Sequence, residues 1–317
     1  MASCARWIIR TGGALVLVAV LGLVLLLLGL DLTTPRLIPP DHVPSVVTRS
    51  GVQNASEGAS RDMAHLLLRG PDGDLIDAAV SLPKAEAGPV PVVIVIGGFG
   101  SAPETLRRVA TYGSNAIVAY GWPDRELLQD DTESSLRRIL AAHHAIHRVP
   151  VQIAALTRWA AAQPWADRQR LVLVGVSLGA VVLPAAEQLL ATSGLARGPT
   201  VLAYGGVGLS AMAERNLRRV PEPWRRPAAA IIGFALRRVE PGDYLSAIHG
   251  PLLIIRPTTD AYVPQSSIDE MIRRAPDSKT VVTLDGGHIH PKSPETLAAL
   301  LRASRAWLQS LDAVNAD

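Results

Sequence analysis

The stretch LVLVGVSLGAVVLP, residues 171–184, decides the fold, because it runs from one apolar segment through Gly-Val-Ser-Leu-Gly into another. The first segment is typical of a buried strand and the second of a helix. Ser177 therefore falls at a strand-to-helix turn, which projects its hydroxyl beyond the backbone. Gly175 and Gly179 lie two residues before and after it, where a side chain would crowd neighbouring segments. This spacing is the G-x-S-x-G elbow that presents a nucleophilic serine.

Further apolar runs follow the same plan, since each ends in glycine or in polar residues. Two strands are expected around the Pro-Asp-Gly turn of residues 65–83, and others within 91–100, 115–122, 170–177, 200–208, 250–260 and 279–288. A helix is expected over 150–163, with Ile153, Leu156, Trp159 and Ala160 on one face. Alternating strands and helices predict an α/β fold, with a mostly parallel central sheet and helices on both faces. In such sheets ligands bind at the carboxyl ends of the strands.

A serine hydroxyl becomes a useful nucleophile when a base takes its proton, and a carboxylate usually orients that base. Behind an elbow of this kind, the chain order is serine, acid, histidine. Asp260 and His288 come in that order, each just past an expected strand. Asp285 is a second candidate acid, but it lies very near His288 in sequence. His290 competes with His288, which we favour because it directly follows a Gly-Gly turn.

These segments together resemble the α/β-hydrolase family, most closely its serine esterase and dienelactone-hydrolase-like branches. The resemblance covers roughly residues 61–314 and rests on GVSLG at 175–179, TTDAYVP at 258–264, GGH at 286–288 and GGFG at 97–100. It implies Ser177 as nucleophile, Asp260 as acid and His288 as base.

The resemblance also implies an oxyanion hole built from backbone amides. One would belong to Leu178, directly after the nucleophile, and the other to Phe99. The family's loop often reads His-Gly-x with x donating, and Gly97-Gly98-Phe99 stands in its place here. The implied reaction is acyl transfer through an acyl-serine intermediate, which requires no metal and no organic cofactor.

A different signal comes from TGGALVLVAVLGLVLLLLGL, residues 11–30, which carries no charge over the length that spans a bilayer as a helix. Arg6 and Arg10 precede this run and Asp31 follows it, so we expect the N-terminus in the cytoplasm. A cleaved signal peptide is the alternative, but the residues after the run match a cleavage site poorly. We expect a single-pass membrane protein with a periplasmic or extracellular catalytic domain.

The expected organisation follows from these signals. Residues 1–10 would be a short cytoplasmic N-terminus, 11–30 a transmembrane anchor, 31–60 a linker rich in Pro, Ser, Thr and Gly, and 61–317 the hydrolase domain. Within that domain, residues 208–243 hold seven arginines against four acidic residues, around the apolar run PAAAIIGFAL. We expect this segment to be either a basic amphipathic lid or ordinary helices packed on the sheet.

Composition excludes other classes of protein. The formal net charge of +3 over 317 residues is too small to indicate a nucleic-acid partner, and one cysteine, Cys4, permits no internal disulfide. His143 and His147 share a helical face at metal-ligand spacing, but no Glu completes the H-E-x-x-H pattern and no cysteine helps, so we expect a solvated face. The sequence therefore predicts a membrane-anchored serine hydrolase acting on a small-molecule or lipid carboxylic ester. A peptidase or thioesterase on the same scaffold, or a non-catalytic binding protein, are the alternatives.

Overall fold

The computed structural model describes most of the chain. The described residues are 34–52, 61–84, 88–109, 113–129, 134–195, 198–290 and 293–315, together with 22, 29, 31, 32 and 132. The expected anchor, 11–30, lies outside them apart from two positions. Within the described part of the chain, no helix combines the length and apolar character needed to cross a bilayer.

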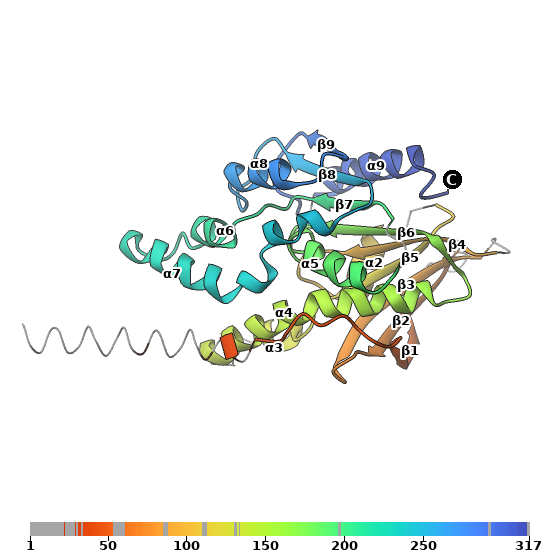
Figure 1. Ribbon diagram of the computed structural model, residues 1–317, viewed down its shortest axis with the longest axis horizontal. Helices are drawn as coiled ribbons and strands as arrows, with labels where there is room; N and C mark the ends of the chain where they lie inside the picture. The colour runs from red at the N-terminus through yellow and green to blue at the C-terminus, as the bar shows by residue number, and fades with distance from the viewer. Residues whose placement is uncertain are drawn as a thin grey trace, which may run out of the picture.

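The described residues form one nine-stranded sheet between two layers of helices (Figure 1). Its order is β1-β2-β3-β5-β4-β6-β7-β8-β9. The bounds are Ser45–Gly51, Arg61–Arg69, Leu75–Pro83, Val90–Ile96, Ala116–Gly121, Ala166–Val176, Thr200–Ala203, Leu252–Pro257 and Lys279–Leu284 for β1 to β9. The pairs β1–β2, β2–β3 and β3–β5 are antiparallel, and the remaining pairs are parallel. The expected mostly parallel sheet is confirmed.

Strand β4 shows how two cores form around this sheet. All seven of its residues are buried, and alternate residues point to opposite faces. Val92 and Ile94 pack on one face with helices α4 (Ser135–Ala161) and α5 (Leu178–Thr192). Val93 and Val95 pack on the other with α2 (Ala102–Val109) and α9 (Pro294–Ser310). The other α-helices of the described residues are α3 (Arg125–Gln129), α6 (Leu209–Asn216), α7 (Glu222–Ala235) and α8 (Gln265–Arg274).

The linker expected over 31–60 needs a correction, because part of it belongs to the sheet. Residues Ser45–Gly51 form β1 and pair antiparallel with β2. Every residue of β1 is exposed, so the strand buries no apolar face whose alternation a sequence pattern would reveal. Backbone hydrogen bonds rather than side-chain burial hold this edge strand in place.

Helix α4 is longer than expected. The predicted helix over 150–163 is the second half of α4, which begins at Ser135 and ends at Ala161, with Pro150 inside it. Proline removes one intrahelical donor and usually marks a helix start. The expected solvated face at His143 and His147 is wrong, since both side chains are buried. Among the described residues, no group of three or more metal-ligating side chains comes together.

Residues 208–243 leave the sheet after β7 and return before β8. Helices α6 and α7 pack against each other and project beyond the carboxyl ends of the parallel strands (Figure 1). Three 3-10 turns follow, Arg237–Val239, Pro241–Asp243 and Leu245–Ala247. The side chain of Glu240 accepts hydrogen bonds from the amides of Gly208 and Leu209, at 2.7 and 2.8 Å, and so ties the two ends of the segment together.

Candidate active site

Ser177 occupies the turn between β6 and α5 in a conformation that L-residues rarely adopt. Its φ is 58° and its ψ is −118°. Its amide donates to the carbonyl of Ala203 on β7 at 2.9 Å, and its own carbonyl accepts from the amide of Ala180 at 3.0 Å. Strained backbone of this kind persists only where surrounding structure fixes it. Here the strain lifts the hydroxyl above the sheet edge.

The two flanking glycines are required by the close approach of three segments. A Cβ added to Gly179 would lie 1.9 Å from the carbonyl oxygen of Ile96 on β4. A Cβ added to Gly175 would lie 2.8 Å from the carbonyl oxygen of Gly179 and 2.9 Å from the backbone of Ala180. Strand β4, strand β6 and helix α5 therefore meet at distances that only glycine permits.

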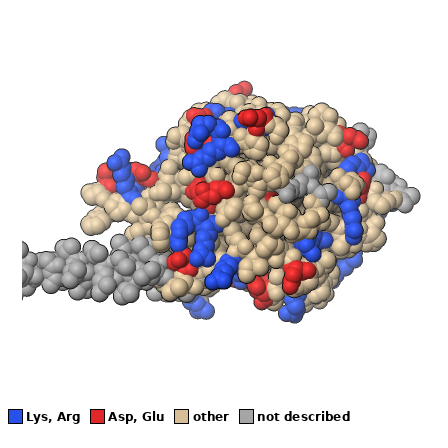
Figure 2. Space-filling model, viewed as in Figure 1, with Lys and Arg blue, Asp and Glu red and all other residues tan. Residues whose placement is uncertain are grey.

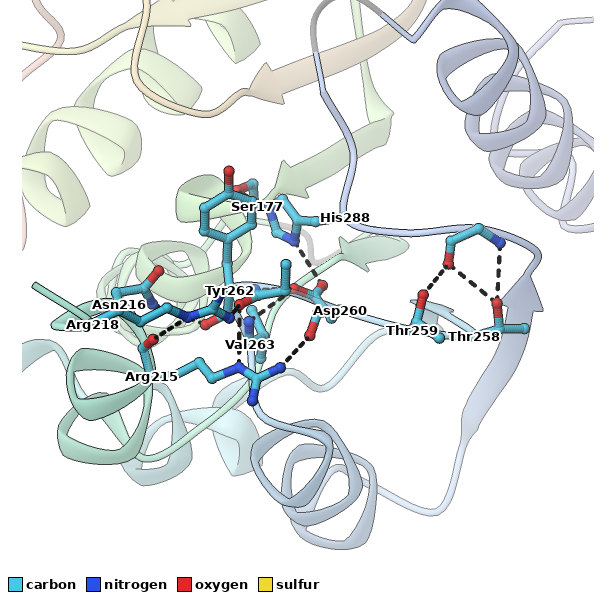
Figure 3. Close-up of polar contacts among 12 residues, drawn as sticks. Ser177, Arg215, Asn216, Arg218, Thr258, Thr259, Asp260, Tyr262, Val263 and His288 are labelled. Carbon is cyan, nitrogen blue, oxygen red and sulfur yellow. Dashed lines mark hydrogen bonds and ion pairs between the residues drawn. The ribbon is translucent and has the colours of Figure 1, made fainter.

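The structure brings the three predicted side chains into one hydrogen-bonded series (Figure 3). The Oγ of Ser177 lies 2.8 Å from Nε2 of His288. The Nδ1 of His288 lies 2.7 Å from Oδ2 of Asp260. The side chains of Asp260 and His288 are 1% and 10% exposed, so water competes little for these bonds. An ionised Asp260 would hold the Nδ1–H tautomer and leave Nε2 free to accept the serine proton.

The hydrogen bonds around Asp260 favour its ionised form. Burial alone would raise the pKa of Asp260, but hydrogen bonds from His288 and from the amides of Val263 and Tyr262 outweigh it and hold that pKa below its usual value. Both amides donate to Oδ1 at 2.8 Å. Oδ2 is thereby left to His288.

The two candidate oxyanion donors belong to residues that line the same cavity as Ser177. Leu178 is the first residue of α5, where backbone N–H groups lack partners within the helix. Phe99 lies in the loop after β4, and both residues line the cavity that holds Ser177. Trp122, which the sequence reasoning missed, supports this loop: its Nε1 donates to the carbonyl of Gly97 at 3.1 Å.

The structure distinguishes His288 and Asp260 from the alternative base His290 and the alternative acid Asp285. His290 lines the same cavity, but the hydrogen bond from Ser177 goes to His288. Asp285 is exposed, and the carboxylate against His288 is that of Asp260. Two aromatic rings flank His288 edge-on, those of Tyr262 and Tyr204, with centroids at 5.1 and 5.7 Å (Figure 3 for Tyr262). The sequence analysis assigned no role to either tyrosine, although Tyr262 lies within TTDAYVP.

The end of helix α6 and the turn after it hold the loop that carries Asp260 (Figure 3). Arg215 donates to the carbonyls of Ala261 and Asp260 at 3.2 and 3.3 Å. Arg218 donates to the carbonyl of Ala261 at 2.8 Å. Asn216 donates to the carbonyl of Tyr262 at 2.9 Å. Two arginines of the expected basic lid thus support the loop that carries Asp260.

Ser177 opens into a cavity of about 580 Å³. Its walls are mostly apolar and come from two sets of helices. One set is α6, α7 and the turn after α7, with Leu209, Met212, Ile232 and Leu236; the other is α2 and α9, with Val109, Leu297, Leu300 and Leu301. Cavities of this size enclose small organic ligands. Apolar walls around one polar series suit a substrate with apolar groups around a single reactive bond.

Comparison with known proteins identifies the architecture. No family model matches the chain, and no curated protein matches it by sequence. Among solved structures, acetyl xylan esterase 1 from Thermoanaerobacterium sp. superimposes with a TM-score of 0.57 at 18% identity, over 84% of this chain and 90% of the esterase. A protein assigned as a dienelactone hydrolase from Klebsiella pneumoniae gives 0.53 at 18% identity, over 78% of this chain and 99% of that one.

A puromycin-hydrolyzing peptidase from Mycobacterium tuberculosis gives a TM-score of 0.56 at 18% identity. This match covers 78% of the present chain but only 38% of the peptidase. At such identities the likeness establishes the architecture and leaves the chemistry to the site. The chain has the α/β-hydrolase fold that these esterases and peptidases share.

Proposed function

We propose that this protein is a membrane-anchored serine hydrolase that cleaves carboxylic esters through an acyl-serine intermediate. One observation carries the proposal: Ser177, His288 and Asp260 form a continuous hydrogen-bonded series at the wall of an apolar cavity. A serine at an unstrained surface turn would need neither the buried histidine nor the two close glycines.

The reaction would begin when Nε2 of His288 takes the proton of Ser177 and Oγ attacks the ester carbonyl carbon. The resulting tetrahedral intermediate collapses, the C–O bond to the alcohol breaks, and His288 returns the proton to the leaving alcohol. Water, deprotonated by His288, then attacks the acyl-serine. The acyl C–Oγ bond breaks, the acid is released, and His288 returns the proton to Oγ of Ser177. General-base catalysis of this kind contributes roughly 10²–10⁴-fold to the rate.

The amides of Leu178 and Phe99 would stabilise the negative charge that the carbonyl oxygen acquires. Each such donor contributes about 3 kcal/mol to lowering the barrier, because it meets charge that develops only in the transition state. The bonds from Trp122 to the Gly97 carbonyl and from the Trp122 amide to the Gly100 carbonyl, at 3.1 and 3.0 Å, support the loop that carries Phe99.

The cavity favours an ester over a peptide. Its walls offer apolar side chains on both sets of helices and few fixed polar groups to hold a peptide backbone. A thioester has the same shape and the same electrophilic carbonyl. Parallel assays with p-nitrophenyl esters, an acyl thioester and an aminoacyl p-nitroanilide separate the three activities.

A fluorophosphonate probe tests the nucleophile directly, because it phosphonylates only an activated serine. We expect the full-length protein to be labelled and Ser177→Ala to lose labelling. Ser193→Ala, at the other end of α5, should be labelled like the wild type. Folded wild-type protein that stays unlabelled would instead support a binding protein that retains the fold.

Membrane anchoring through residues 11–30 is the second part of the proposal, and the charge-free length of the run and its preceding arginines support it. The protein should stay in the membrane fraction after alkaline extraction. Cys4 provides a topology probe, since it is the single cysteine in the chain. A membrane-impermeant maleimide should label Cys4 only after permeabilisation, while external protease should degrade the hydrolase domain in intact cells. Release by alkali, or labelling of Cys4 without permeabilisation, would contradict the anchor or its orientation.

A further inference from the structure

Helix α7 has two apolar faces, and the cavity accounts for only one of them. Ile232 lines the cavity and Ala229 is buried. The opposite face exposes Pro223, Pro227, Ala230 and Phe234, which recur at helical spacing and so share one side of the helix. Trp224, beside them, is 67% exposed. We call these five residues the α7 stripe.

The α7 stripe is connected to Asp31, the residue that directly follows the apolar run 11–30, through Arg237. The guanidinium of Arg237 stacks on the ring of Phe234, 4.0 Å from its centroid. Arg237 also forms an ion pair with Asp31, and Arg238 binds the same carboxylate at 2.8 Å. Phe234, Arg237 and Asp31 thus form a continuous chain of contacts. Asp31, the residue directly after positions 11–30, is thereby held at the carboxyl end of α7.

The Thr34 side chain strengthens this attachment, because its Oγ1 lies 3.3 Å from Nε2 of the buried His143 on α4. The segment that follows the run is therefore docked on the domain rather than held away from it. A run that spans a bilayer must leave the hydrocarbon near its last residue. A membrane holding residues 11–30 would then have its surface next to Phe234.

We infer that the α7 stripe rests on the surface of a phospholipid bilayer. At 1.5 Å per residue, α7 is about 21 Å long, so a helix lying along the surface would bring Trp224 to it as well. Tryptophan partitions into the interfacial layer of membranes, and apolar helix faces bury there. Ion pairs between Arg225 and Glu222 and between Arg226 and Glu214 neutralise the nearest charges. In Figure 2 the projecting end of α6 and α7 carries blue and red side chains next to one another, with uncharged surface below them.

The same helix connects the bilayer to the active site. Ile232 faces the cavity while Ala230 and Phe234 face outward, so one helix separates bilayer from cavity. This placement assigns the substrate class as an amphipathic ester dissolved in the membrane, which would enter beside α7. The substrate assignment rests on the proposed hydrolase activity, whereas the bilayer contact rests only on the proposed anchor at residues 11–30.

Site-specific labels on the full chain test the contact. In a Cys4→Ser background, Ala230→Cys is labelled with an NBD fluorophore and the protein is reconstituted in phosphatidylcholine vesicles. Brominated phosphatidylcholine should quench this label about twofold, because it lies in the interfacial layer. The matched control is Asp277→Cys, whose native side chain is fully exposed before β9 and which should not be quenched. Pro227→Cys gives an independent reading from the same face.

An activity measurement tests whether the substrate enters from the membrane beside α7. Trp224→Glu should hydrolyse p-nitrophenyl palmitate in vesicles about tenfold more slowly than wild type, which corresponds to about 1.4 kcal/mol of lost surface interaction. Its hydrolysis of soluble p-nitrophenyl acetate should not change. Leu311→Glu, a control at an exposed apolar residue after α9, should leave both rates unchanged.

The outcomes are distinguishable. Labels at 230 and 227 that resist quenching, or a protein that does not join the vesicles, overturn the bilayer contact. Quenched labels with equal losses on both esters in Trp224→Glu overturn the entry route. If neither ester is hydrolysed and the fluorophosphonate probe fails, the proposed function is wrong, while the quenching result still decides the bilayer contact.

Discussion

Replacing Gly179 by alanine should disable both the fold and the site, because the space for a methyl group is already filled by backbone. The new Cβ would lie 1.9 Å from the carbonyl oxygen of Ile96, whereas real Cβ atoms essentially never come closer than 3.0 Å. Either α5 or β4 must therefore move by about 1.1 Å, and both lie at the centre of the buried core. Such overpacking without room to relax costs about 3 kcal/mol or more of unfolding free energy.

The assay is thermal unfolding of the full chain in mild detergent, followed by the rate of fluorophosphonate labelling. A loss of 3 kcal/mol lowers Tm by roughly 6–12 °C in a domain of this size. Gly175→Ala, with contacts of 2.8 and 2.9 Å, should show a smaller loss. Gly88→Ala is the matched control, since nothing lies within 4 Å of its added Cβ. A Gly179→Ala protein that melts within about 1 °C of wild type and labels at the wild-type rate would refute the reasoning.

Three further predictions concern charges around the site and in the core. Replacing Arg215 and Arg218 together by alanine should lower kcat about tenfold with little change in KM, because the loop of Asp260 loses hydrogen bonds that hold it but no substrate contacts. Arg219→Ala is the control and should leave both kinetic constants unchanged. Asp260→Asn should lower kcat on p-nitrophenyl acetate by roughly 10²–10⁴-fold. Because the pKa of Asp260 is depressed in the folded state, its contribution to stability should be present above about pH 4 and lost below it. The Tm of the variant should therefore depend less on pH in that acid range than the Tm of the wild type. Burial lowers the pKa of His147 from 6.5 to about 4, so the unfolded chain binds the proton first, and stability should fall as pH drops from about 6.5 to about 4; His147→Leu should remove part of that slope, and an unchanged slope would contradict the assignment.

The elbow could be predicted because its physical requirements are local. A serine at a strand-to-helix turn needs small residues two positions away on each side, and Gly175 and Gly179 satisfy that rule within five residues of sequence. The order of Asp260 and His288 after Ser177 was equally visible, since each follows an apolar run. The Gly-Gly turn favoured His288 over His290 as the base, and the geometry places His288 against Ser177.

The features that the sequence did not reveal depend on backbone groups that lie far away along the chain. Arg215 and Arg218 donate to carbonyl groups about 45 residues further along, and a carbonyl has no identity in a sequence. Strand β1 was hidden because backbone pairing alone places its exposed residues. Pro150 suggested a helix boundary, although α4 continues through it because buried residues on both sides hold the helix against the sheet.

Helix α6 both lines the cavity and holds the loop of Asp260, and this combination has a consequence for engineering the protein. Leu209 and Met212 bound the space that an ester would fill, while Arg215 and Asn216, within the next turn, brace the acid. Reshaping that wall to admit a bulkier compound would also disturb the orientation of the imidazole. Under the proposed function, selectivity and turnover are linked through α6. Variants chosen for a new specificity at α6 should then show slower chemistry unless the contacts that hold the Asp260 loop are rebuilt at the same time.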